Sequence, residues 1–170
     1  MLLYQRFVPG LAIASYVVGD ERSGEAAVVD PTRDVDEFIH YANENDRHIK
    51  HILETHVHAD FVSGARELKA RLGDEPQIHS SGMGGAEWTP PDADHVAADG
   101  DEVRVGSVRL QAVHSPGHTP EHVSWVLYDE TRSKDTPWLM FTGDFLFVGD
   151  VGRPDLLGEE AKQELAHQLY

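Results

Sequence analysis

The sequence predicts a fold of the α/β or α+β class, in which helices cover β-sheets. Three observations support this. Strand-like and helix-like patterns interleave over the first 75 residues, and short alternating strands follow in the middle of the chain. The 170 residues are enough for one hydrophobic core, and the 40% hydrophobic and 26% charged residues are typical of a globular protein.

The first half is expected to alternate strands and helices. Strands are predicted at 11–18, 25–29 and 48–53, and a polar loop at 55–63. One helix is predicted from the apolar stripe of Val35, Phe38 and Ala42, and a second helix ends at Gly73. The second half begins with an irregular segment, 81–94. Strands are then expected at 102–105, 107–113, 122–128 and 138–141, and a helix at 159–170.

Charge and composition exclude several functions. There are 14 Lys and Arg against 30 Asp and Glu, a formal net charge of −16, which repels a phosphate backbone, so nucleic acid is not an expected partner. No apolar run is long enough to span a membrane, and no signal peptide is recognisable, so a cytoplasmic location is expected. Cysteine is absent and there are 11 histidines, so a transition-metal site must use imidazole and carboxylate ligands.

The first chemically informative segment is Thr-His-Val-His-Ala-Asp-Phe at 55–61. If it is extended, His56, His58 and Asp60 point to one side, because alternate residues of an extended chain share a face. Two imidazoles and a carboxylate suit a borderline divalent metal. The alternative is a polar loop whose histidines are merely solvated.

Two further segments also follow predicted strands. Pro116 and Gly117 form a tight turn that presents His118, whereas His122 begins the next strand and is expected to pack. Asp144 follows an apolar strand and Gly143, a good position for a ligand, although aspartate is also common in ordinary turns.

Together, Thr-His-x-His-x-Asp, Pro-Gly-His-Thr and Thr-Gly-Asp resemble the metallo-β-lactamase superfamily, and the resemblance extends from about residue 11 to residue 155. It implies an αββα sandwich with a metal at one edge between two sheets, held by His56, His118 and Asp144. It also implies that Val28–Pro31 borders the site.

Within the superfamily, residues 54–64, 115–119 and 143–155 most resemble persulfide dioxygenases, including those fused to a rhodanese domain. This implies one Fe(II) per chain in a mononuclear non-haem centre with open positions for O₂ and substrate. The implied reaction is oxidation of a low-molecular-weight persulfide, as in sulfide detoxification. His58 and Asp60 would then orient the ligands, or His58 would be a fourth ligand. Arg153 would bind an anionic substrate group, or form only a structural salt bridge.

Glyoxalase II-like hydrolases share these motifs, which leaves a Zn(II)-dependent thioester hydrolase as the alternative. In the hydrolase pattern a histidine directly follows the aspartate of the first motif, but here that position is Phe61. The superfamily's last histidine ligand is not found either. One metal and dioxygenase chemistry are therefore preferred, and a non-catalytic metal-binding fragment is a third possibility.

The organisation expected is one domain, 1–170, incomplete in its second half. It would lack the final strand and helix as well as any rhodanese domain. Such a chain exposes a sheet edge, so a homodimer is expected. The expected partners are a small-molecule thiol persulfide or thioester, and a rhodanese domain or protein.

Overall fold

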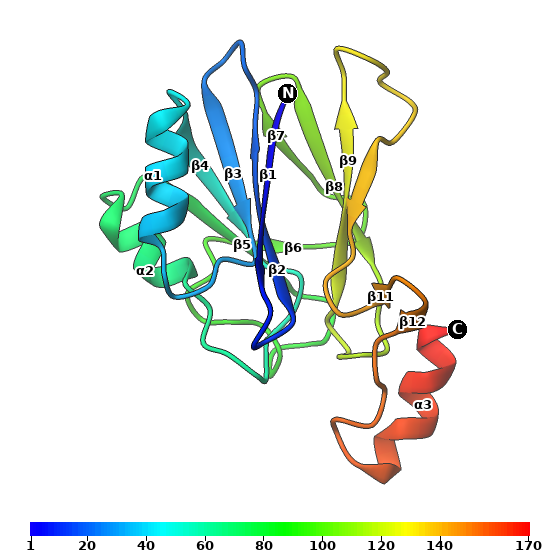
Figure 1. Cartoon of the computed structure of the whole chain (residues 1–170). Helices are drawn as coiled ribbons and strands as arrows, with labels where there is room; N and C mark the ends of the chain where they lie inside the picture. The colour runs from blue at the N-terminus through cyan, green and yellow to red at the C-terminus, as the bar shows by residue number, and fades with distance from the viewer.

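The computed structural model describes residues 1–170 and contains two facing β-sheets (Figure 1). The larger sheet has six strands in chain order, and β1, β2 and β3 are antiparallel whereas β3 to β6 are parallel. Its strands are β1 (Leu2–Val8), β2 (Ile13–Gly19), β3 (Glu25–Val29), β4 (His48–Leu53), β5 (Gln77–Ser81) and β6 (His95–Ala97).

The second sheet has four antiparallel strands in the order β10-β9-β8-β7. They are β7 (Glu102–Val105), β8 (Val108–His114), β9 (Val123–Asp129) and β10 (Leu139–Phe141), followed by the hairpin of β11 (Leu146–Phe147) and β12 (Asp150–Val151). The helices are α1 (Asp36–Glu44), α2 (Ala65–Arg71) and α3 (Glu159–Leu169). None of them is both long and apolar enough to cross a membrane.

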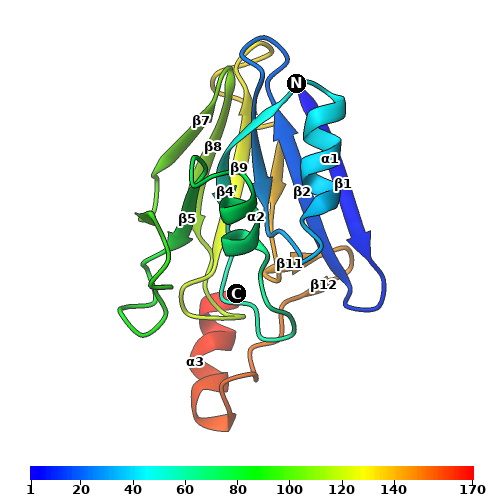
Figure 2. The same ribbon diagram turned by 90° about the vertical axis from the view of Figure 1, so that its left-hand side faces the viewer.

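Two apolar cores follow from the alternation of side chains along the strands. On β3, Val28 packs toward the helices and Val29 packs between the sheets; on β4, Ile52 and Leu53 divide in the same way. Helices α1 and α2 cover the outer face of the six-stranded sheet (Figures 1 and 2). Trp125 is fully buried and is the largest side chain between the sheets.

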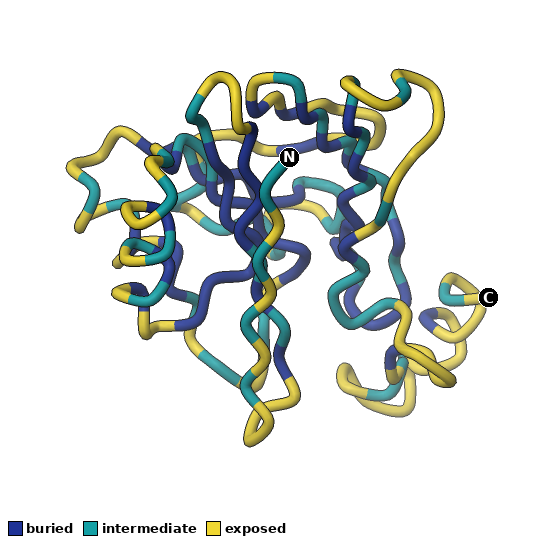
Figure 3. Tube along the Cα trace, turned by 45° about the horizontal axis from the view of Figure 1, so that its top comes forward, coloured by how far each residue is buried: buried dark blue, intermediate teal, exposed yellow.

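The structure confirms the predicted fold class, with one helical layer on two sheets. Helix α3 extends from one end of the sandwich in both views and does not cover the four-stranded sheet (Figures 1 and 2). Most of α3 is exposed (Figure 3), and Leu165 is its only buried residue.

Most predicted elements are present within a residue or two, but five strands were not predicted. These are β1, β5, β6 and the two short strands β11 and β12. In β1, half-buried and exposed residues alternate, which is typical of an edge strand rather than of a buried core strand. Strands β5 and β6 flank the irregular segment at residues 82–94.

Candidate metal centre

The structure brings His56, His118 and Asp144 together at one edge of the sandwich. His56 follows β4, His118 lies between β8 and β9, and Asp144 follows β10. The His118 Nε2 is 3.5 Å from Asp144 Oδ2, and the His56 Nε2 is 4.0 Å from the same oxygen. Both histidines are buried, whereas the Asp144 side chain is 39% exposed. The centre is therefore open to solvent on its carboxylate side.

The spacing of these three donors fits a single transition-metal ion. Two ligands about 2.1 Å from one ion lie about 3.0–3.4 Å apart, depending on the ligand–metal–ligand angle. One donor atom from each residue lies within 4.8 Å of the others. A small inward movement of Asp144 would therefore complete a site of two imidazoles and one carboxylate.

A hydrogen-bonded chain fixes which nitrogen of His56 faces the centre. The backbone N–H of Thr55 donates to Asp30 Oδ1 at 2.7 Å, and its hydroxyl donates to Asp30 Oδ2 at 2.8 Å. Because the Thr55 hydroxyl proton is donated to Asp30, the hydroxyl oxygen can only accept a hydrogen bond from His56 Nδ1, at 3.0 Å. The proton of His56 thus sits on Nδ1, and Nε2 offers its lone pair to a metal.

Asp30 has an unusual backbone, as functional positions often do. Its φ is +46°. Two hydrogen bonds hold this backbone: the Asp30 N–H donates to the Leu53 carbonyl at 2.9 Å, and the Ser15 hydroxyl donates to the Asp30 carbonyl. The expectation that Val28–Pro31 borders the site agrees with this placement.

The environment favours neutral imidazole at both histidines of the triad. Burial, together with the nearby His58, His122 and His118, lowers the pKa of His56 well below its usual value. Burial also lowers the pKa of His118, and the Asp144 carboxylate opposes this shift. Neutral imidazoles are the form that binds metal.

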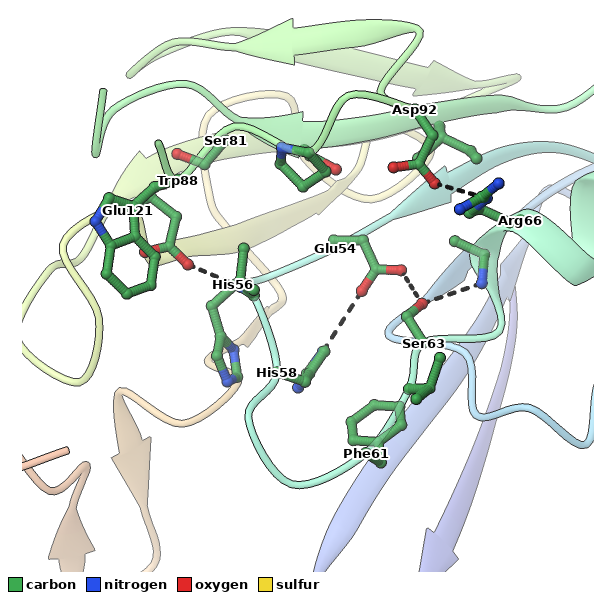
Figure 4. A pocket seen from close by; sticks show the side chains of 16 residues that line it. Glu54, His56, His58, Phe61, Ser63, Arg66, Ser81, Trp88, Asp92 and Glu121 are labelled. Atoms are coloured by element: carbon green, nitrogen blue, oxygen red, sulfur yellow. Dashed lines mark hydrogen bonds and ion pairs between the residues drawn. The ribbon is translucent and has the colours of Figure 1, made fainter. Parts of the chain in front are cut away.

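The expectation that His56, His58 and Asp60 share one face holds only in part: the rings of His56 and His58 have centroids 4.1 Å apart, but Asp60 is exposed. The segment is a bent loop rather than a strand, so the alternation of an extended chain does not apply. His58 Nε2 lies 3.5 Å from Glu54 Oε2 (Figure 4). It also lies 3.3 Å from Asp30 Oδ1. Asp60 belongs neither to the cluster of His56, His118 and Asp144 nor to that of Asp30, Glu54 and His58.

The carboxylate neighbours of His58 favour its protonated form, although burial also raises the pKa of Glu54. Burial alone would lower the pKa of His58, but hydrogen bonds and charge from Asp30 and Glu54 outweigh burial and raise it to about 10. A protonated imidazole has no lone pair for a metal. In this placement His58 does not offer a fourth ligand, and its orienting role stays a prediction.

Phe61 occupies the position where the hydrolase pattern has histidine, and its ring centroid is 4.3 Å from that of His58. An apolar ring there offers no ligand to a second ion. Arg153 forms a two-pronged ion pair with Asp155, with both contacts at 2.9 Å. This arrangement agrees with the structural salt bridge considered for Arg153.

Two further residues support the centre: His122, which packs as expected, and Glu121, which had no assigned role in the sequence analysis. His122 is fully buried, accepts or donates a bond to Ser115 at 2.9 Å and stacks on His56 with ring centroids 5.0 Å apart. Glu121 Oε1 accepts from the backbone N–H of Val57 at 2.7 Å, which anchors the loop that carries His56 (Figure 4). The only signal for Glu121 in the sequence is an acidic residue among turn residues.

Gly143 allows Asp144 to approach the histidines. Its φ is +47°, and a β-carbon there would lie 2.4 Å from Thr55 Oγ1 and 2.7 Å from His122 Nε2. Any larger residue would therefore collide with the group that orients His56.

A cavity of about 320 Å³ adjoins the centre on the side of the loop between β4 and α2. His56, His58 and Phe61 line it together with Trp88 and Glu121, whereas His118 and Asp144 do not (Figure 4). Its volume is at the lower end of the range for small-molecule sites.

Comparison with known proteins defines the class. Residues 8–168 match the family model described as the metallo-beta-lactamase superfamily, and the chain belongs to that superfamily. The human protein named persulfide dioxygenase ETHE1, mitochondrial, is 33% identical over 173 residues, which cover 100% of this chain and 60% of that protein.

Two solved structures are also similar. A metallo-beta-lactamase from Staphylococcus aureus has a TM-score of 0.89 and 39% identity, covering 99% of this chain and 49% of that one. ETHE1 from Myxococcus xanthus has a TM-score of 0.82 and 28% identity, covering 99% of this chain and 68% of that one. The chain spans about 60% of the length of the persulfide dioxygenases that it matches.

Proposed function

We propose that this chain is a mononuclear non-haem iron persulfide dioxygenase or its metal-binding part. The observation that carries the proposal is the cluster of His56, His118 and Asp144, with Phe61 in place of a ligand to a second ion. Two histidines and one carboxylate suit Fe(II) and leave open positions, whereas hydrolases that use two metals need further ligands. The similarity to proteins named persulfide dioxygenase supports the same choice.

The proposed reaction oxidises the terminal sulfur of a small-thiol persulfide with O₂ and water, giving the thiol and sulfite. The bound iron would supply the redox chemistry. The chain's own residues position the reactants: Asp30 and Thr55 orient His56, and Phe61 with Trp88 supplies apolar walls to the cavity beside it. The exposed side of Asp144 leaves a path from solvent.

Two measurements on protein purified without added metal test the proposal. Elemental analysis should find iron near one equivalent per chain, and oxygen uptake should start when a small-thiol persulfide is added. His56→Ala, His118→Ala and Asp144→Ala should each lose the tightly bound metal, because each removes one of three ligands. His40→Ala is the matched control, since His40 is exposed on α1 and pairs only with Glu44.

The main competitor is a zinc-dependent thioester hydrolase. Zinc in place of iron, thioester cleavage and no oxygen uptake would establish it instead. Metal binding without either activity would leave a non-catalytic metal-binding chain. Because the chain spans about 60% of the persulfide dioxygenases that it matches, the uptake assay also tests whether residues 1–170 suffice for turnover.

A further inference from the structure

A row of three histidines crosses the parallel part of the six-stranded sheet, apart from the centre at His56. His79 on β5 is paired in register with Leu53 of β4 on one side and with His95 of β6 on the other. His51 lies two residues before Leu53, and His95 lies two residues before Ala97. Leu53 and Ala97 belong to the core between the sheets. Since alternate strand residues share a face, all three histidines face the space between the sheets.

The nitrogens of His51 and His79 are already close together. His51 Nδ1 is 3.0 Å from His79 Nε2. Two imidazole nitrogens bound tetrahedrally to one zinc ion lie about 3.4 Å apart, so only a small separation is needed. His95 stacks on His79 with ring centroids 4.8 Å apart and planes 16° apart. The donor atoms of the three histidines do not all lie within 4.8 Å of one another, so His95 has to move to become the third ligand.

The row opens into a cavity of about 520 Å³, which gives an ion access. Asp101 and Glu102 line the same cavity, and Trp125 is also part of its wall. His95 is exposed and is therefore free to rotate about its side-chain bonds. Arg104 also lines the cavity, but its guanidinium is paired with Glu102 at 3.6 Å and with Glu130 at 3.1 Å. Asp101 and the net charge of −16 therefore favour a cation over an anion in this cavity.

The environment of His51 and His79 favours the neutral imidazole, which is the form that binds metal. Burial, with the neighbouring His51 and His95, lowers the pKa of His79 to about 3. Burial also lowers the pKa of His51, and the charge of Glu25 opposes this shift. Neutral imidazoles bind a borderline divalent ion without releasing a proton, provided that each keeps its N–H on the nitrogen facing away from the ion.

We propose that His51, His79 and His95 form a second metal site that binds a borderline divalent ion such as Zn²⁺ or Ni²⁺. His51 Nδ1 and His79 Nε2 supply two ligands, and His95 supplies the third after its ring turns away from His79. Water completes the coordination, because Glu102 is paired with Arg109 at 2.7 Å and Asp101 accepts from the Ala98 N–H at 2.8 Å. This site does not depend on the proposed dioxygenase activity, because it shares no residue with the centre at His56.

The test is a Zn²⁺ titration by calorimetry on protein in which the other centre is disabled. In a His118→Ala, Asp144→Ala background, we expect one equivalent of Zn²⁺ to bind. Adding His79→Ala should abolish this binding, and adding the matched change His40→Ala should leave it intact. His95→Ala should weaken binding without disturbing the fold, because this side chain is exposed. Circular dichroism on each variant checks folding.

Two outcomes would overturn the proposal. One is the absence of Zn²⁺ binding in the background variant. The other is unchanged binding after both His79→Ala and His95→Ala, which would show that the zinc binds elsewhere and that His51 and His79 are only a hydrogen-bonded pair. If His79→Ala does not fold, the comparison of His95→Ala with His40→Ala still decides.

Discussion

The orientation of His56 by Thr55 yields a quantitative prediction. In Thr55→Val a methyl group replaces the hydroxyl that links Asp30 Oδ2, at 2.8 Å, to His56 Nδ1, at 3.0 Å. The residue is fully buried, so water cannot replace the lost bonds. His56 would then be free to rotate or to place its proton on the nitrogen that should bind metal.

We expect Thr55→Val to weaken metal binding by about 10- to 100-fold, the usual effect of removing a group that orients a ligand. This corresponds to about 1.4–2.7 kcal/mol of binding free energy. The unsatisfied Asp30 oxygen and His56 nitrogen should also lower the free energy of unfolding of the metal-free protein by about 1–3 kcal/mol. Thr55→Ser keeps the hydroxyl and serves as the control.

Competition with a chromophoric chelator measures the metal affinity, and urea denaturation measures the stability. Thr55→Ser should stay close to the unmodified protein in affinity. If Thr55→Val binds metal as tightly as Thr55→Ser, the chain from Asp30 through Thr55 does not orient His56, and the argument for a fixed nitrogen fails.

Three further predictions concern neighbouring residues. Gly143→Ala should lower the melting temperature more than Gly149→Ala, because both have positive φ but only position 143 meets Thr55 and His122. The pKa of His58 is raised in the folded state to about 10. In the metal-free protein, the stabilisation from His58 should therefore be fully present below about pH 6.5 and lost as the pH rises toward 10. Urea denaturation of His58→Gln at several pH values should not show this loss. Phe61→His in a His79→Ala background should raise the affinity for a second metal ion only partly, by elemental analysis after dialysis. Two tight equivalents in the His79→Ala variant with Phe61 intact would contradict the one-metal centre.

The motif residues could be placed from the sequence because each follows a strand. Strands β4 and β10 belong to different sheets but end at the same edge of the sandwich. The histidine after β4 and the aspartate after β10 therefore meet there, although they are far apart in the chain. The direction of His58 could not be predicted in this way. It depends on Asp30 and Glu54, whose side chains approach His58 only in the folded loop.

The strands, too, could be predicted from the sequence only in part. Strand β3 was predicted with its observed bounds, because its continuous apolar run is buried on both faces. Strands β5 and β6 contain His79 and His95, which face the space between the sheets, and their polar residues obscure the apolar pattern. The histidine row was missed for this reason, since its members come from strands that the apolar pattern alone does not mark.

The cluster beneath the metal centre bears directly on the choice between oxygenase and hydrolase chemistry. Asp30 and Glu54 are both buried, and His58 is the cation between them. Turning His58 toward the metal as a fourth ligand would leave two buried carboxylates without their counterion. Breaking a buried ion pair in this way costs about 3–5 kcal/mol. A fourth imidazole–metal bond would have to exceed this cost, which supports the proposed centre of three protein ligands with open positions on the ion.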